Sequence, residues 1–223
     1  MQEKTPATAR FRPPRRIADA SFRELLGELA WRRLAPAVRE RFAWKPAPGA
    51  AIRYVGMMNV VRASAAGWLM AQACRLLGTP LAPYRGSDVP VAVTLRLDGD
   101  GHGIVWERLY RFAGRAPVRC ASVKKATDEG LIECVGAGIG MWLKLSEHKG
   151  ELHFRSTGYF WRRGRRRVCL PRWLTPGELH VVHADLGGGW FRFRIAVRHR
   201  LLGETLFQDG IFAEEKGVEP WTA

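Results

Sequence analysis

An arginine is embedded in a row of apolar and aromatic residues near the middle of the chain. Counting by two along one expected strand places Ile104, Trp106, Arg108, Tyr110 and Phe112 on the same face, because successive side chains of a strand point to opposite sides. A face of this composition packs into a core. A guanidinium buried there without compensation costs several kcal/mol, so Arg108 needs an anion or water beside it.

Three environments would satisfy Arg108. It can form an internal salt bridge, for which Glu133, Asp185 and Asp209 are the candidate partners. It can line a cavity where the anionic group of a ligand supplies the missing charge, since the fork of a guanidinium suits carboxylates and phosphates. It can also lie at a sheet edge in contact with solvent. The salt bridge is the ordinary solution, and the ligand clamp is the one with a functional consequence.

A second group of polar residues lies among apolar strand residues. His183 and Asp185 share one face of an apolar run, and Gln208 lies in the last expected strand. Together with Arg108 they could form an acid and base site. However, the sequence contains no Ser or Cys in a nucleophile elbow, no carboxylate pair typical of glycosidases and no His-Glu-x-x-His motif. We therefore predict no catalytic residue and expect satisfied structural polar groups, with an enzyme that uses Arg108, His183 and Asp185 as the alternative.

A glycine-rich run, GAGIG at 136–140, resembles a phosphate-binding loop only superficially. A dinucleotide-binding fingerprint follows a strand and opens a helix, whereas residues 141–145 continue as a strand. We interpret the run as a bulge or bend in a curved sheet and predict no cofactor.

The densest run of positive charge is RRGRRR at 162–167, flanked by Trp161 and Trp173. Basic residues beside aromatic ones are typical of nucleic-acid interfaces, and a basic hairpin tip can also rest on an anionic membrane surface. A solvated turn that discourages edge pairing is the plainer interpretation. The candidate anionic-surface residues are Arg162, Arg163, Arg165, Arg166 and Arg167.

Composition limits the classes of function. The net charge of +15 arises from 36 Lys and Arg against 21 Asp and Glu, which favours anionic partners and predicts at least weak attraction to anionic surfaces. The four cysteines lie far apart, and no His lies at zinc-ligand spacing from them, so neither a metal site nor a disulfide framework is expected. Residues 1–16 are basic and lack the apolar segment of a secretory signal, so we expect a cytoplasmic protein. The most apolar stretch, 55–77, is interrupted by charge, and no transmembrane segment is expected.

Alternating hydrophobicity begins at Val89 and continues to the end of the chain. It predicts about nine short strands joined by tight turns, which indicates an antiparallel meander. We therefore expect a mainly β fold of the α+β kind, a strongly curved sheet or barrel-like body, with a two-layer β-sandwich as the alternative. The expected strands are 89–97, 104–112, 118–125, 131–135, 141–147, 152–161, 179–185, 190–199 and 204–212.

The N-terminal part is expected to cover this sheet. Residues 1–18 are interpreted as a basic tail, 19–215 as a single domain with a helical cover over 19–80, and 216–223 as a C-terminal tail. Within the cover we expect a helix from about 22 to 34, a second from Pro36 to about Phe42, a short strand at 52–58 and a helix from about 62 to 77. The apolar face of the last helix would be a docking face, a lid over a ligand, or part of the core.

Several local signatures together resemble the family known as domain of unknown function 4166, which is found mostly in bacteria. The matching motifs are VPV at 89–91, WERLYRF at 106–112, LPRWLTPG at 170–177, WFRF at 190–193 and HRLLGETLFQDGIF at 199–212. The resemblance covers about residues 20–213 and implies no assigned activity. It implies an accessory role beside a nucleotide-dependent oxidoreductase. This chain departs from the family pattern at Arg200, where a proline commonly follows the histidine.

These observations favour a non-enzymatic binding or accessory domain. Its curved sheet would enclose an apolar pocket for a small amphipathic or acidic ligand, with Arg108 at the polar end. An enzyme or the partner of a redox enzyme, and an anionic-surface binder, are the competing classes. The predicted ligand-binding residues are Arg108, Trp106, Tyr110, Phe191, Phe193, Gln208 and His183.

Overall fold

The structure, a computed structural model, describes residues 22–44, 47–75, 81–127, 129–164 and 166–215. The expected tails at 1–18 and 216–223 lie outside the described residues. The helices are α1 (Phe22–Leu26), α2 (Glu28–Arg33), α3 (Pro36–Ala43), α4 (Ala65–Cys74) and the 3₁₀ helix η2 (Arg172–Leu174). The strands are β1 (Ala51–Ala63), β2 (Gly86–Leu97), β3 (Ile104–Tyr110), β4 (Val118–Thr127), β5 (Gly130–Gly136), β6 (Ile139–His148), β7 (Glu151–Arg163), β8 (Arg166–Cys169), β9 (Glu178–Gly187), β10 (Trp190–His199) and β11 (Gly203–Glu214).

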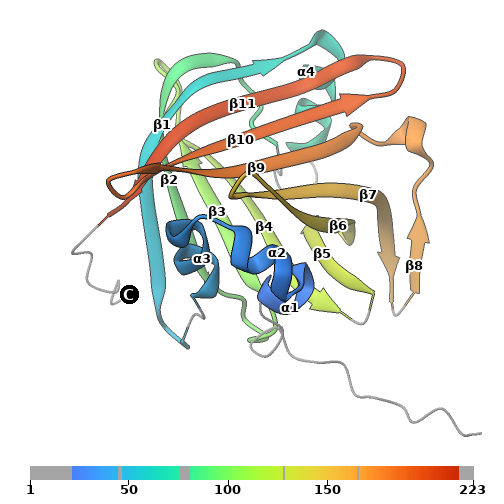
Figure 1. Cartoon of the computed structure of the whole chain (residues 1–223). Coiled ribbons are helices and arrows are strands. Elements are labelled where there is room, and N and C mark those ends of the chain that lie inside the picture. Colours follow the sequence, from blue (N-terminus) through green and yellow to red (C-terminus); the bar gives the residue numbers. More distant parts are fainter. Residues whose placement is uncertain (1–21, 45–46, 76–80, 128, 165, 216–223) are drawn as a thin grey trace, which may run out of the picture.

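Ten of these strands form a closed antiparallel barrel, and β8 is an additional strand (Figure 1). The sheet runs in the order β6-β5-β4-β3-β2-β1-β11-β10-β9-β7-β8, and the further pairing of β6 with β7 closes it. The predicted barrel-like meander is therefore confirmed. The sandwich alternative is wrong, because a single sheet joins back on itself instead of splitting into two layers.

The strand expected at 52–58 is far longer than its sequence pattern indicated. β1 spans 13 residues and pairs with β2 on one side and with β11 on the other. The register of β1 against β11 shifts between Met58 and Val60, so residues after the shift that would point outward point inward. The regular alternation of apolar and polar residues that indicates a strand is therefore interrupted there. The expected count of about nine strands missed β8 as well, which has only four residues and pairs with the end of β7.

The N-terminal helices differ from the prediction in one respect. The expected single helix from about 22 to 34 is broken at Gly27, whose φ of 87° is incompatible with a continuing α-helix. α3 begins at Pro36 as predicted. α4 is shorter than expected and begins after Ser64, whose hydroxyl accepts a hydrogen bond from Gly67 N at 3.1 Å.

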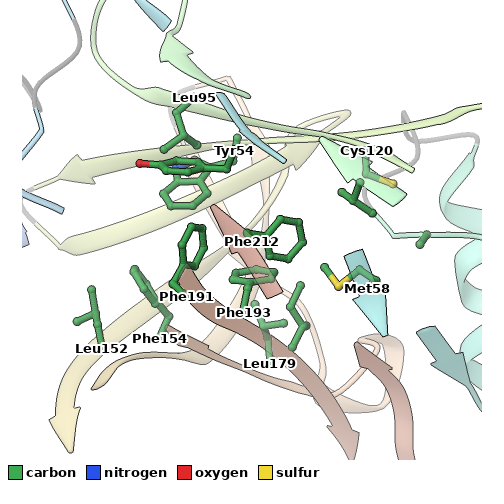
Figure 2. Packing of buried hydrophobic residues seen from close by; sticks show 14 of the residues in the cluster. Tyr54, Met58, Leu95, Cys120, Leu152, Phe154, Leu179, Phe191, Phe193 and Phe212 are labelled. Carbon is green, nitrogen blue, oxygen red and sulfur yellow. The ribbon is translucent and has the colours of Figure 1, made fainter. Parts of the chain in front are cut away.

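The helices lie at the two ends of the barrel. α1, α2 and α3 cover one end, where Gly150 in the β6–β7 turn accepts a hydrogen bond from Ala35 N and Arg33 pairs with Glu147. α4 lies at the other end, against the start of β11 (Figure 1). Between them the core is rich in aromatic rings, and Figure 2 shows Phe191, Phe193 and Phe212 side by side in it.

The glycine-rich run at 136–140 is the tight turn between β5 and β6. Ala137 and Gly138 both have positive φ, of 46° and 79°, which is the conformation of a two-residue hairpin turn. A register shift between Cys134 and Gly136 adds the predicted bulge. The run is therefore a bend in the sheet, as expected.

Candidate functional site

The barrel encloses a large, mostly apolar cavity. It comprises about 1220 Å³ of space free of protein atoms, counted out to its opening on the surface. Apolar side chains of β5, β6, β7, β9 and β10 form much of its wall, and a few polar groups lie among them. The polar and charged lining residues are Cys74, Trp106, Arg108, Tyr110, Lys124, Glu133, Tyr159, Thr175, His183 and Gln208. Concave apolar spaces with a few polar groups are typical of sites for small ligands.

Arg108 lies in the barrel interior on β3. Its Nη2 donates a hydrogen bond to Ser122 Oγ on the neighbouring strand β4 at 3.2 Å, while its buried Nε has no hydrogen-bond partner. Among the described residues it forms no direct salt bridge. Asp209 pairs instead with Arg192, whose Nε lies 2.7 Å from Oδ1, and Glu133 pairs with Lys124. The predicted internal salt bridge of Arg108 is therefore wrong.

Lys124 and Glu133 form an ion pair beside Arg108. Lys124 Nζ lies 3.0 Å from Glu133 Oε1, and both side chains are buried, with exposed fractions of 10% and 7%. The ammonium also lies 4.4 Å from the ring centroid of Trp106, a cation–π contact. Ser122, which accepts the hydrogen bond from Arg108, is also close enough to Glu133 to lower the pKa of that carboxyl.

The ionisation of this cluster shows that its surroundings are positive. Burial would raise the pKa of Glu133, but the attraction of Lys124 and Arg108 outweighs it, and the pKa is lowered. Burial lowers the pKa of Lys124, and the repulsion of Arg108 lowers it further. Two cations thus share one carboxylate, so the cluster carries a net positive charge among mostly apolar side chains.

His183 on β9 lies deep in a cage of aromatic rings. Its ring centroid is 4.8 Å from that of Phe193 and 4.9 Å from that of Phe42. Burial lowers its pKa well below the ordinary value, and the nearby charges of Arg41 and Lys124 act in the same direction. His183 is therefore neutral, and its buried Nδ1 has no hydrogen-bond partner.

Tyr110 and Gln208 form a neutral polar pair in the same cavity. The Tyr110 hydroxyl donates a hydrogen bond to Gln208 Oε1 at 2.8 Å, between β3 and β11. Burial raises the pKa of Tyr110, so the phenol stays protonated. The pair offers a ligand a hydrogen-bonding surface without a charge.

A smaller cavity lies under the N-terminal helices. It comprises about 570 Å³ and shares Trp106, Arg108, His183 and Phe193 with the larger one, so these four residues form the partition between the two. Arg41 of α3 lines the smaller cavity, with its guanidinium carbon 3.9 Å from the ring centroid of Phe191. Arg41 Nη1 is buried without a hydrogen-bond partner, and burial lowers the pKa of this guanidinium.

Each of the predicted ligand-binding residues lines at least one of the two cavities. Arg108, Trp106, Phe193 and His183 line both cavities. Tyr110 and Gln208 line the larger cavity, and Phe191 lines the smaller one.

Asp185, part of the alternative acid and base site, lines neither cavity. It lies two residues beyond His183 on β9, and its charge attracts the guanidinium of Arg41. The buried Oδ1 of Asp185 has no hydrogen-bond partner. No hydrogen bond connects Asp185 with Arg108 or His183 in the part of the chain that the structure describes.

Lys124 is the most important residue that the sequence prediction missed. Adjacent residues of a strand point to opposite faces, so one of Lys124 and Lys125 had to point inward. Cys120 and Ser122 point inward, and Lys124 follows them at the same spacing of two residues, so Lys124 is the one that points inward. Arg41 had no comparable signal, because only the packing of α3 over the barrel end brings it to the cavity.

The arginine-rich run lies at the β7–β8 turn. Register places Arg162 opposite Arg167 and Arg163 opposite Arg166. Arg167 pairs with Glu129 at 2.7 Å, whereas Arg162, Arg163 and Arg166 are exposed. Arg165 lies outside the described residues.

The described residues contain neither a metal-binding cluster nor a membrane-spanning helix. No group of three or more His, Cys, Asp or Glu side chains among them is arranged to hold a metal ion. None of the helices in the described ranges combines the length and the apolar character that crossing a membrane requires.

The comparisons with known proteins give one result. A family model with the description "Domain of unknown function (DUF4166)" matches residues 34–212. Neither the curated proteins nor the solved structures provide a match. The matched range contains α3, α4 and the barrel up to β11, which confirms the resemblance inferred from the sequence motifs.

Proposed function

The chain belongs to the domain of unknown function 4166 family, and from the geometry of the barrel interior we propose that it is a non-enzymatic binding protein for a small amphipathic acid. The anionic group of the ligand lies against Arg108. Its hydrocarbon part lies along the apolar wall of the larger cavity.

The observation that carries this proposal is a guanidinium without an ion-pair partner among the described residues, on the wall of an apolar cavity. Arg108 lines both cavities, and its Nη2 donates to the neutral hydroxyl of Ser122, whereas Glu133 is paired with Lys124. A charge in apolar surroundings costs free energy unless an opposite charge lies beside it, so the anionic group of a ligand would be stabilised at Arg108.

The charge of the ligand follows from the lining residues. Within the described cavity walls the cations Arg41, Arg108 and Lys124 are accompanied by one carboxylate, Glu133. An anionic ligand would compensate the excess, and hydrogen bonds to charged groups contribute about 1.5–3 kcal/mol each. A cationic ligand would add to the repulsion that already lowers the pKa of Lys124.

The amphipathic character follows from the position of the charges. The charged group lies at the partition, while Val135, Met141, Leu179, Val181 and Ile195 line the cavity beyond it. An acid with a hydrocarbon chain therefore enters with its anionic group first and leaves its chain against these residues. Burial of each methylene contributes about 0.8 kcal/mol.

Competition binding tests this proposal. The full chain is loaded with the fluorescent anion 1-anilinonaphthalene-8-sulfonate, which is then displaced by decanoate or by decanol, a neutral amphiphile of the same length. We expect decanoate to compete about 10- to 150-fold more strongly than decanol, from the strength of a charge-assisted hydrogen bond. Equal competition by the two molecules would contradict the proposal.

The variant Arg108→Met isolates the contribution of the guanidinium. It should remove the preference for decanoate while leaving the competition by decanol within a few fold. Arg111→Met is the matched control, because Arg111 is exposed just beyond the end of β3. A preference for decanoate that persists in Arg108→Met would assign the anion site to other residues.

Two other classes of function make different demands on the structure. A redox-accessory or enzymatic role, suggested by the family resemblance, would use Arg108 and His183 on the partition and would require Asp185 to join them on ligand binding. Attraction to anionic surfaces through the exposed Arg162, Arg163 and Arg166 would be abolished by salt.

The described cysteines are free, which supports the proposed cytoplasmic location.

A further inference from the structure

α4 is a surface helix without a charged residue. Its sequence, AAGWLMAQAC, contains Gln72 as the only polar side chain besides Cys74, although one face of the helix is exposed. Trp68 and Leu69 lie on that face, and Leu69 is 62% exposed. A helix on a protein surface normally turns a polar face to water, whereas a helix that is apolar all round is normally covered. The outer face of α4 therefore fits an apolar covering.

Two further apolar segments lie next to α4. A Cβ on Gly67 would lie 1.8 Å from the Thr205 carbonyl oxygen, so α4 packs directly on the start of β11. The Thr205 hydroxyl in turn donates a hydrogen bond to Pro176 O at 2.8 Å, just after η2. The β10–β11 turn, which precedes Thr205 by a few residues, reaches the same end of the barrel (Figure 1).

These segments bring large exposed apolar side chains to one end of the barrel, which we call the α4 rim. Trp173 in η2 is 68% exposed, and Leu201 in the β10–β11 turn is 80% exposed. Exposed apolar residues scattered singly are ordinary, but a group of them gathered around one opening marks an interaction surface. The α4 rim consists of Trp68, Leu69, Trp173, Leu174, Leu201 and Leu202.

Arginines surround the α4 rim. Exposed arginines flank every one of its three segments, whereas two of the nearby carboxylates already pair with cations: Glu204 with Arg62 at 3.3 Å and Glu178 with Arg155 at 3.5 Å. The charge around the apolar patch is therefore positive, and it is complementary to an anionic surface. Apart from Arg62, whose charge Glu204 offsets, the exposed arginines beside these segments are Arg75, Arg172, Arg198 and Arg200, and Arg85 lies just before β2.

The α4 rim also contains the opening of the larger cavity. Leu174 is 59% exposed and lines that cavity at the same time, so the cavity reaches the surface beside it. Leu81 and Cys74, on the α4 side, line the cavity as well. Apolar surface at the rim is thus continuous with the apolar wall inside.

We propose that the α4 rim docks on an anionic phospholipid surface, with Trp68 and Trp173 inserted at the headgroup level and the surrounding arginines against the lipid phosphates. Tryptophan is enriched at membrane interfaces, and an apolar face ringed by basic residues lies in the plane of such an interface. The cavity opening then faces the lipid, so an amphipathic acid passes between the two without crossing water. This last consequence rests on the proposed function, whereas the docking itself does not.

Vesicle flotation tests the docking. The full chain is mixed with vesicles of phosphatidylcholine containing a quarter phosphatidylglycerol, and with vesicles of phosphatidylcholine alone. We expect binding to the anionic vesicles and at least about tenfold weaker binding to the neutral ones, because every arginine near the surface adds to the attraction. Equal binding to the two kinds of vesicle, or none to either, would overturn the proposal.

Paired tryptophan variants locate the contact. Trp68→Ser with Trp173→Ser should weaken vesicle binding by roughly tenfold or more. Trp190→Ser is the matched control, because Trp190 is 50% exposed at the start of β10, the end of that strand remote from the rim. A loss with the control variant that equals the loss with the rim variant would overturn the assignment to this surface.

Two competing occupants give different results. If the β7–β8 turn makes the contact, Arg162→Gln with Arg163→Gln abolishes flotation and the rim variant does not. If the rim binds a second copy of the chain, sedimentation without lipid shows a dimer that the rim variant loses. Either result overturns the proposal. Decanoate affinity in solution should be unchanged in the rim variant, so a failure of ligand binding is distinguishable from a failure of docking.

Discussion

Replacing Arg108 by Met should stabilise the ligand-free protein while it abolishes the preference for an anionic ligand. The change removes one hydrogen bond, the 3.2 Å contact with Ser122, whose contribution is about 0.5–1.5 kcal/mol. It also removes a buried charge with an unpartnered Nε and the repulsion on Lys124. Replacing buried ionic groups by apolar ones of similar volume stabilises proteins by about 1–4 kcal/mol when no opposite charge is left without a partner, and Glu133 keeps its ion pair with Lys124 in this variant. The variant also loses the Ser122 hydrogen bond and the attraction between Arg108 and Glu133, so we expect the free energy of unfolding to rise by about 0–3 kcal/mol.

Chemical denaturation with and without decanoate measures both effects in one experiment. Without ligand, Arg108→Met should unfold at a higher denaturant concentration than the wild type, and its melting temperature should rise by about 2–4 °C for each kcal/mol. With decanoate, the wild type should gain stability and the variant should gain little. The reasoning is refuted if Arg108→Met is less stable than the wild type by more than about 1 kcal/mol, because Arg108 would then be a structural partner of Glu133.

Three further predictions concern His183, Lys124 and Gly67. The folded pKa of His183 lies well below its unfolded value, so the unfolded chain takes up the proton first and stability falls as the pH drops below about 6.5. Between pH 7 and pH 5, the free energy of unfolding of His183→Asn should therefore fall by about 2 kcal/mol less than that of the wild type. Denaturation at the two pH values measures this difference. Lys124→Met leaves one cation for Glu133 and should weaken decanoate binding by roughly tenfold, as a displacement titration would show. Gly67→Ala places a Cβ 1.8 Å from the Thr205 carbonyl oxygen and should cost about 1–3 kcal/mol, with faster proteolysis at α4; unchanged proteolysis would argue against the close packing of this helix.

Much of the barrel could be predicted because its strands alternate cleanly between inward and outward side chains. Phe191, Phe193 and Ile195 on β10 illustrate this, since every second residue is buried. The alternation is interrupted in β1, where the register shift after Met58 changes the parity, and the full length of that strand could not be seen. β8 is too short for a period to be recognised.

The candidate site was predictable only in part for a related reason. Arg108 could be found because a charge is conspicuous among the aromatic residues that share its side of the strand. Its interactions could not be found, because they depend on which strand lies beside β3: β4 brings Lys124 and Ser122 close, and α3 brings Arg41 over the barrel end. Pairing and helix docking are properties of the closed barrel, not of any one segment.

The pairing of β1 with β11, which joins the first strand to the last, has a consequence for synthesis of the chain. β1 has a partner in β2 early, but its other edge stays unpaired until residues 203–214 have left the ribosome. Pairing between segments so distant in sequence is slow, and an unpaired edge strand is a template for aggregation. A chain that stalls before the last hairpin therefore carries two open edges, those of β1 and β9, and is the form in which assistance by a chaperone would matter most.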